Sequence, residues 1–301
     1  MNISTTKFKG IFPALLTPMN KDHSVDHDSL ERLVEHLLGQ RVHGFYVGGS
    51  TGEGFILTKE ERKQLLETVV RANAGRGTVI AHVGAISTLE AIDLAKHAES
   101  SGADAISAVV PFYYKITMRE IEEHYLEVMK ATKLPMIIYH FPGATGVSLS
   151  MDFYKKMSEH PQCLGVKFTS LNLFEMQQIR ALCGQDFLIY NGHDEIYSAG
   201  ALMGADGAIG STFNVMAPLF VDMYEKVQRG EWTALAGPQA AANEIIAKLI
   251  QFDVFAGEKY ICYLQGVFAA AHIRQPLKQL QESEKDAIRS YFESSLVLKG
   301  R

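Results

Sequence analysis

Three short apolar runs decide the fold: MIIYH at residues 136–140, LGVKF at 164–168 and FLIYN at 187–191. In each run the apolar residues follow one another instead of alternating with polar ones, which is typical of strands buried on both faces. The segments between the runs have the spacing of amphipathic helices. Because parallel strands need a helical crossover between them, this stretch predicts successive strand–helix units.

Similar apolar runs continue in both directions from this stretch. Eight strands separated by helices, with right-handed crossovers, close most simply into a (β/α)8 TIM barrel. A doubly wound open sheet is the alternative, but nothing resembling G-x-G-x-x-G follows the first run. The remaining predicted strands are 10–16, 44–48, 78–83, 105–110 and 207–210.

Helix start signals and a change of pattern after about residue 214 complete the organisation. Capping boxes are predicted at Thr58–Glu61, Ser87–Glu90 and Thr117–Glu120, where a hydroxyl and a carboxylate can satisfy free backbone N–H groups. We predict that residues 1–229 form the barrel that carries the active site and residues 230–301 a C-terminal helical subdomain. The helices expected from the tail of the chain are 217–229, 233–251, 258–271 and 282–295.

Composition narrows the class of protein. The chain of 301 residues is 47% hydrophobic and 21% charged, and its net charge of -5 argues against a nucleic-acid surface. No apolar run approaches the ~20 residues that span a bilayer, and MNISTTKFKG lacks the apolar core of a signal peptide, so we expect no membrane partner and a cytoplasmic location. Cys163, Cys183 and Cys262 are too few and scattered for a disulfide framework or a zinc site.

Lys167 is the candidate nucleophile. In a barrel the C-terminal ends of the strands carry the active site, and Lys167 stands near the end of an apolar strand. Apolar surroundings disfavour the ammonium form and make a neutral amine available near neutral pH. Tyr139, near the end of the preceding strand, can act as a proton shuttle beside it or can simply fill the core.

Other strand ends carry weaker signals. The loop Gly48–Glu53 offers flexible backbone and two hydroxyls, which suit a carboxylate or a phosphate. Asp194 and Glu195 can cap the following helix or accept hydrogen bonds from a polyol. His82 is expected to be a core histidine. No H-E-x-x-H motif is present, and we expect neither a metal site nor a hydrolase triad.

Four of these segments carry a family resemblance, which extends in order and spacing over essentially the whole chain. They resemble the dihydrodipicolinate synthase/N-acetylneuraminate lyase family. The resemblance implies a class I aldolase barrel with a helical C-terminal subdomain, usually a homotetramer, that uses no metal or organic cofactor but a covalent Schiff base through Lys167. The segments are GGSTGE at 48–53, YHFPGATG at 139–146, GVKFT at 165–169 and GAIGS at 207–211.

Single positions favour the lyase branch of the family. The synthases usually have an arginine two residues after the proline of the 139–146 segment, but here Ala144 follows Pro142 at that distance. Ser50 stands where the synthases usually have threonine, and the acidic pair 194–195 resembles the lyase pattern. His140 and His193 differ from the asparagine and the aromatic residue often found in lyases.

The resemblance therefore implies reversible cleavage of N-acetylneuraminate, a sialic acid, to N-acetylmannosamine and pyruvate. The alternatives are an aldolase for another 2-oxo acid, such as a 2-keto-3-deoxy sugar acid, a dihydrodipicolinate synthase-like enzyme, or a non-catalytic sugar-acid sensor. By resemblance the catalytic residues are Lys167, Tyr139 and Tyr113, the last joining the site across a subunit interface. The implied substrate-binding residues are Ser50, Thr51, Thr169, Gly192, Asp194, Glu195 and Ser211.

Overall fold

The structure is a computed structural model that describes residues 5–300, so the outermost residues of both predicted domains, 1–4 and 301, lie outside it. Its eight strands form one sheet in the order β1-β8-β7-β6-β5-β4-β3-β2. The strands that follow one another along the chain are therefore neighbours in the sheet, as the strand–helix pattern predicts. The strands are β1 Gly10–Pro13, β2 Gly44–Val47, β3 Thr78–His82, β4 Ala105–Val109, β5 Met136–His140, β6 Cys163–Phe168, β7 Leu188–Asn191 and β8 Gly207–Gly210.

The two ends of this sheet order are joined, which closes the barrel. β1 and β2 stand at opposite ends of the order, yet Ala14, just after β1, forms a parallel bridge with Tyr46 of β2. The N–H of Leu15 donates to the carbonyl of Tyr46 at 2.9 Å. The predicted (β/α)8 barrel is confirmed.

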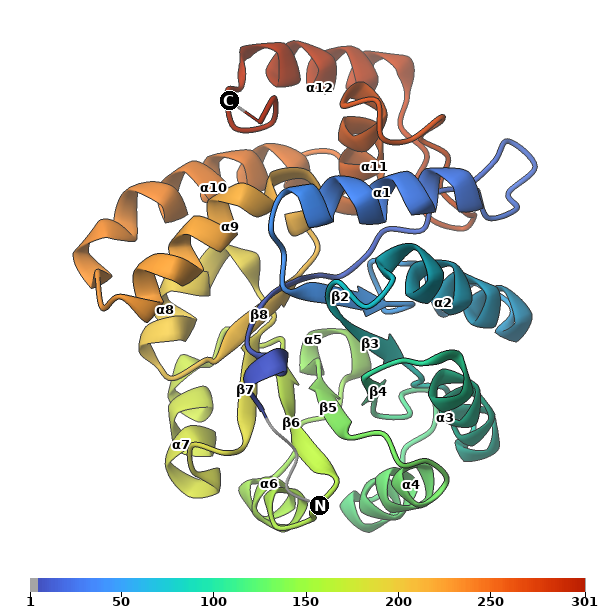
Figure 1. The fold of residues 1–301 in the computed structure, drawn as a ribbon, viewed down its shortest axis with the longest axis vertical. Coiled ribbons are helices and arrows are strands. Elements are labelled where there is room, and N and C mark those ends of the chain that lie inside the picture. Colours follow the sequence, from blue (N-terminus) through green and yellow to red (C-terminus); the bar gives the residue numbers. More distant parts are fainter. Residues whose placement is uncertain (1–4, 301) are drawn as a thin grey trace. The chain divides into compact units, whose positions relative to one another are not determined.

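Helices follow the strands as predicted, and the colours of Figure 1 show the order of these elements along the chain. The capping boxes at Thr58 and Thr117 are confirmed. The third is wrong, because the Ser87 side chain makes no capping hydrogen bond; the neighbouring Thr88 hydroxyl instead contacts His124 Nδ1 at 2.9 Å. The helices are η1 Thr6–Phe8, α1 His27–Gly39, α2 Lys59–Asn73, α3 Thr88–Ser101, α4 Met118–Lys130, α5 Pro142–Thr145, α6 Met151–Ser158, α7 Leu173–Cys183, η2 Asp194–Ile196, α8 Tyr197–Leu202, α9 Phe213–Gln228, η3 Trp232–Ala234, α10 Ala236–Ile250, α11 Val254–Leu264 and α12 Glu282–Ser294.

The described chain falls into two compact units. The first contains the residues up to Gly10 together with Thr78–Ile209, and the second contains Ile11–Gly77 and the chain from Gly210 onward. In the first unit α3, α4, α6 and α7 lie outside the strands (Figure 1). The predicted division at residues 229/230 stays a prediction.

One predicted helix ends early. The pattern predicts a helix over 258–271, but α11 ends at Leu264. Gly266 has a φ of +75°, a left-handed conformation that ends helices and that glycine adopts without steric cost. Among residues 5–300, no helix has both the length and the apolar character needed to cross a membrane.

Candidate active site

Lys167 and Tyr139 are partners in the first unit. They lie opposite each other in the register of β5 and β6. Lys167 Nζ is 4.2 Å from the centroid of the Tyr139 ring, and both residues are buried. The strand pairing therefore brings the predicted nucleophile and the predicted proton shuttle into direct contact.

The amine of Lys167 has the electrostatic setting of a nucleophile. Burial lowers its pKa to about 7, while the Asp194 carboxylate acts in the opposite direction and raises it. The face of an aromatic ring also attracts an ammonium, but burial outweighs both effects. A large share of the amine is consequently neutral at physiological pH, as attack on a carbonyl requires.

His140 lies on the other side of the strand from Tyr139. Successive side chains of a strand point to opposite faces. The His140 ring stacks on Phe168 at 5.2 Å between centroids, and its Nε2 is 3.9 Å from a carboxylate oxygen of Glu175 on α7. Burial lowers the pKa of His140 to about 4, so the ring is neutral. The His140 side chain, which stands where many lyases have asparagine, therefore faces the α-helical layer and not Lys167.

Thr169 and Gly192 approach each other at the ends of β6 and β7. The N–H of Thr169 donates to the carbonyl of His140, and the N–H of Gly192 donates to the carbonyl of Phe168, both at 2.9 Å. A Cβ at position 192 would lie 2.0 Å from Thr169 Oγ1. Only glycine allows this close approach.

The acidic pair begins the short helix η2. Asp194 is buried and influences Lys167, while Glu195 is half-buried and accepts a hydrogen bond from His193 Nδ1 at 3.1 Å. This hydrogen bond lowers the pKa of Glu195. The His193 ring packs edge-on against Phe141, with 6.4 Å between the ring centroids.

His82 is a core histidine, as predicted. It is buried in β3, and its Nε2 accepts a hydrogen bond from the N–H of Val109 at 3.3 Å. Its ring lies edge-on to Tyr139 at 6.0 Å between centroids. His82 thereby supports the Tyr139 ring.

The glycine-rich loop after β2 belongs to the second unit. Thr51 is buried and Ser50 half-buried. The loop is tightly turned, because the N–H of Glu53 donates to the carbonyl of Ser50 and the N–H of Gly54 to the carbonyl of Gly49, both at 3.0 Å. This conformation holds the two hydroxyl-bearing residues in a fixed backbone setting.

Ser211 also belongs to the second unit and is fixed by a residue that the sequence did not reveal. Asn214 is fully buried, and its amide nitrogen donates to the carbonyls of Ser211 at 2.6 Å and of Ala14 at 2.7 Å. Its oxygen accepts from the N–H of Leu16 at 3.2 Å. No motif marked Asn214, since its role depends on contacts with residues distant in the chain.

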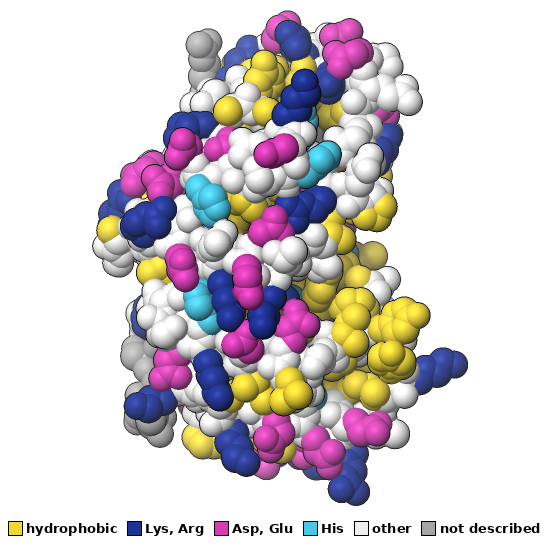
Figure 2. Space-filling view, turned by 90° about the vertical axis from the view of Figure 1, so that its right-hand side faces the viewer, with side chains coloured by type: hydrophobic (Ala, Val, Ile, Leu, Met, Phe, Trp, Pro, Cys, Tyr) yellow, Lys and Arg dark blue, Asp and Glu magenta, His cyan; other side chains and the backbone are white. Residues whose placement is uncertain are grey.

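Tyr113 lies at the surface of the first unit, whereas Lys167 is buried. Tyr113 is 73% exposed and packs edge-on against Tyr114, 68% exposed, at 5.1 Å. Exposed hydrophobic side chains also gather on the face drawn in Figure 2. Two neighbouring tyrosines with this exposure are typical of a protein interface.

A buried ion pair was also missed from the sequence. Glu53, at the end of the glycine-rich loop, pairs with Lys259 of α11, and neither side chain is exposed. Sequence spacing gave no signal for a pair so distant along the chain. In residues 5–300, no three His, Cys, Asp or Glu side chains are grouped so as to hold a metal ion.

Comparison with known proteins agrees with this architecture. The chain is 40% identical over 283 residues to N-acetylneuraminate lyase 2 of Escherichia coli O6:H1, covering 94% of this chain and 92% of that one. CdNal from Clostridium difficile, solved in complex with mannosamine, is 33% identical with a TM-score of 0.92 over 95% of this chain and 98% of that one.

A sialic acid aldolase of Ruminococcus gnavus, solved as a catalytic lysine mutant, is 30% identical with a TM-score of 0.93 over 96% of each chain. The model of the dihydrodipicolinate synthetase family matches residues 7–294. The strands, the buried lysine and these matches lead to one conclusion: the chain belongs to the dihydrodipicolinate synthetase family.

Proposed function

We propose that this chain is a class I aldolase that cleaves N-acetylneuraminate reversibly to N-acetylmannosamine and pyruvate. The observation that carries the proposal is the buried amine of Lys167, whose pKa of about 7 suits a Schiff-base nucleophile and which lies 4.2 Å from the Tyr139 ring. The names of the relatives, N-acetylneuraminate lyase and sialic acid aldolase, favour this substrate over other 2-oxo acids and over a non-catalytic sensor.

The first step is the formation of the Schiff base. Ser50 and Thr51 bind the substrate carboxylate through N–H and O–H donors. The neutral amine of Lys167 attacks C2 of the open-chain sugar acid, and loss of water gives a protonated imine. This iminium is the electron sink for the next step.

Carbon–carbon cleavage follows. The Tyr139 hydroxyl relays the proton of the C4 hydroxyl, passing its own proton to the substrate carboxylate as the C3–C4 bond breaks, and the electron pair of that bond moves into the iminium to give an enamine. N-acetylmannosamine leaves with its new aldehyde at the former C4. The enamine is then protonated at C3, and water hydrolyses the resulting imine to pyruvate and free Lys167.

The sugar chain is recognised by polar groups. Gly192, Asp194, Glu195 and Ser211 bind the polyol, and Thr169 lines the pocket beside Lys167. Asp194 and Glu195 as carboxylates accept hydrogen bonds from hydroxyl groups. A substrate analogue without the matching hydroxyl would leave buried polar groups unpaired, so this recognition discriminates strongly.

Tyr113 is proposed as the third catalytic residue, acting across a subunit interface. Its 73% exposure in a single chain suits a residue that is covered by a partner. We propose a homotetramer in the cytoplasm in which Tyr113 supports the proton relay of Tyr139. The enzyme needs no metal or organic cofactor, because the iminium itself supplies the electron sink.

Reductive trapping tests the proposal. The protein is treated with borohydride in the presence of N-acetylneuraminate or pyruvate, and the modified peptide is identified by mass spectrometry. Adducts on Lys167, including one of pyruvate mass formed from N-acetylneuraminate, are the expected result. An adduct with pyruvate alone would retain the aldolase class but exclude this sugar acid, and no adduct with either would exclude the mechanism.

A further inference from the structure

A buried ion pair joins the glycine-rich loop to the C-terminal helices of the second unit. Glu53 is the last residue of the GGSTGE segment, and Lys259 lies in α11. Neither side chain has any exposed surface. An ion pair so deeply buried is rare, because removing two charges from water costs several kcal/mol for each ion.

The same two side chains hold a third segment. Lys259 Nζ donates to the carbonyl of His272 at 3.0 Å, and Glu53 Oε2 accepts from the N–H of Arg274 at 2.8 Å. The Arg274 guanidinium in turn binds both carboxylate oxygens of Glu61 in α2, at 2.7 and 2.6 Å. Glu53 therefore connects the loop, α11 and the segment 272–274.

The backbone of the loop depends on this anchor. Glu53 has a φ of +59°, an uncommon conformation for a residue with a side chain. Its N–H closes the turn on the carbonyl of Ser50, and Thr17 Oγ1 donates to the carbonyl of Gly52 at 2.7 Å. The turn that presents Ser50 and Thr51 is thus fixed by the residue whose carboxylate meets Lys259.

Stability alone does not account for this arrangement. Burial lowers the pKa of Lys259, which means that the surroundings oppose its charge. Replacing a buried ion pair by apolar residues of similar volume is often neutral or stabilising. A positional role for the two charges explains why they occupy this place.

We propose that Glu53 and Lys259 are positioning residues that set the orientation of Ser50 and Thr51 toward the substrate carboxylate. The inference rests on the proposed function, which gives these two residues their ligand. It extends that function to α11, a helix beyond the last strand of the barrel. Small displacements of the groups that bind a substrate have large effects on its binding and reaction. Loss of the Glu53–Lys259 ion pair should therefore weaken the binding of the substrate carboxylate.

Steady-state kinetics in the synthesis direction tests the inference, because pyruvate and N-acetylmannosamine are then varied separately. For Lys259→Met and Glu53→Gln, we expect the KM for pyruvate to rise by about tenfold or more, because a misplacement of about 1 Å can cost up to about 100-fold, with little change in the KM for N-acetylmannosamine. The double variant Glu53→Gln/Lys259→Met should recover stability, since no buried charge is left without its counterion, yet keep the raised KM.

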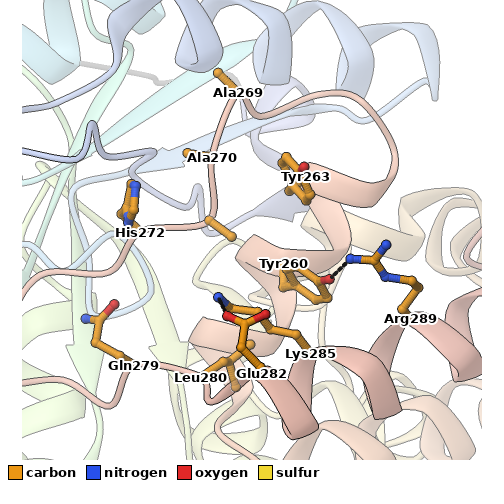
Figure 3. Close-up of a pocket in the computed structure, with 11 residues that line it drawn as sticks. Tyr260, Tyr263, Ala269, Ala270, His272, Gln279, Leu280, Glu282, Lys285 and Arg289 are labelled. Atoms are coloured by element: carbon orange, nitrogen blue, oxygen red, sulfur yellow. Dashed lines mark hydrogen bonds and ion pairs between the residues drawn. The ribbon is translucent and has the colours of Figure 1, made fainter.

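Two control variants in the same unit distinguish an effect on the position of the loop from a general loss of stability. Lys285→Met makes the same chemical change on α12, where Lys285 pairs with Glu282 at 2.6 Å in the wall of a cavity of about 370 Å³ (Figure 3). Leu249→Ala removes a buried side chain of α10 that packs against Gly257 of α11. Both should retain the wild-type KM for pyruvate, and Leu249→Ala should lower the melting temperature.

The outcomes are distinct. An unchanged KM for pyruvate in both single variants, or equal increases for both substrates, would overturn the positioning role. If one single variant does not fold, the KM for pyruvate of the other single variant and of the double variant decides whether the pair has a positioning role. Borohydride trapping of the wild-type protein with pyruvate is run in parallel: absence of a Lys167 adduct there would refute the proposed function, whereas an adduct with unaltered variants would refute only this inference.

Discussion

Lys167 Nζ lies 4.2 Å from the ring centroid of Tyr139, its register partner on the adjacent strand. Neighbouring strands are separated by about 4.8 Å, so the sheet itself sets the distance between amine and phenol. Both residues come from rigid strands and not from loops, which is the arrangement that keeps reacting groups in place. The pair therefore needs no conformational change to come together.

Lys167→Ala should abolish turnover and preserve the fold. The substitution removes the only amine proposed to form the imine, and it also removes a buried group whose charged form is disfavoured, so the melting temperature should not fall greatly. Circular dichroism and a pyruvate-release assay measure the two properties. Lys155→Ala, which removes a lysine of the exposed ion pair with Glu159, serves as the control and should retain full activity. Normal cleavage by Lys167→Ala would rule out the mechanism.

Tyr139→Phe should slow cleavage of the C3–C4 bond far more than imine formation. Loss of a positioned acid–base group typically costs 10²- to 10⁴-fold, so we expect a decrease of about that size in the cleavage step. Rapid-quench trapping measures imine formation separately from pyruvate release. Tyr125→Phe is the matched control, because the Tyr125 hydroxyl is also buried but donates to the carbonyl of Ala108 at 2.8 Å. Equal losses in both steps of Tyr139→Phe would indicate a positioning role instead.

The rate of imine formation with pyruvate should follow the titration of Lys167. Burial lowers its pKa to about 7, and only the neutral amine attacks, so the rate should rise about tenfold per pH unit below that value and level off above about pH 8. Asp194 raises this pKa, so Asp194→Asn should move the profile toward lower pH. Pyruvate lacks the sugar chain, and the shift is therefore independent of the proposed role of Asp194 in polyol binding.

A profile that stays in place in Asp194→Asn would contradict the electrostatic coupling between the two residues. Glu195→Gln is the comparison, since it removes the adjacent carboxylate of the pair, whose partner is His193. We expect this variant to weaken binding of N-acetylneuraminate and to leave the pyruvate profile unchanged.

The sequence predicted the barrel well because its strands are buried on both faces, so their apolar runs are unbroken and easily bounded. The bounds of β5 and β8 agree with the prediction to the residue. Lys167 was equally visible, as a lone cation in an apolar run. These features depend on local sequence, which a single chain displays directly.

The remaining features depend on contacts between distant residues. Nothing near Glu53 or Lys259 in the sequence announces their ion pair, and Asn214 gives no sign that it binds the backbone beside Ser211. The capping box predicted at Ser87 was wrong: the residue types match the motif, but the Ser87 side chain makes no capping hydrogen bond, and residue types alone do not show which bonds a side chain forms. The positions of residues on the strands were therefore predictable from the sequence, and the long-range contacts that hold the neighbouring loops were not.

His140 should make the fold sensitive to acid. Burial holds its folded-state pKa at about 4, below the ordinary value of 6.5, so the unfolded chain binds a proton that the folded chain excludes. Stability linked to His140 is therefore complete above about pH 6.5 and is lost as the pH falls toward 4. Between pH 7 and pH 5 the loss amounts to about 2 kcal/mol.

In His140→Asn this dependence should disappear, and the free energy of unfolding should change less between pH 7 and pH 5 than in the wild type. Urea unfolding at the two pH values measures it. His124, also buried with a pKa of about 4, offers a parallel variant, His124→Asn, with the same expected effect. Because His140 faces Phe168 and Glu175 instead of Lys167, the variant should still form the pyruvate imine at pH 7. An undiminished pH dependence would mean that the ring is protonated or exposed in the folded protein.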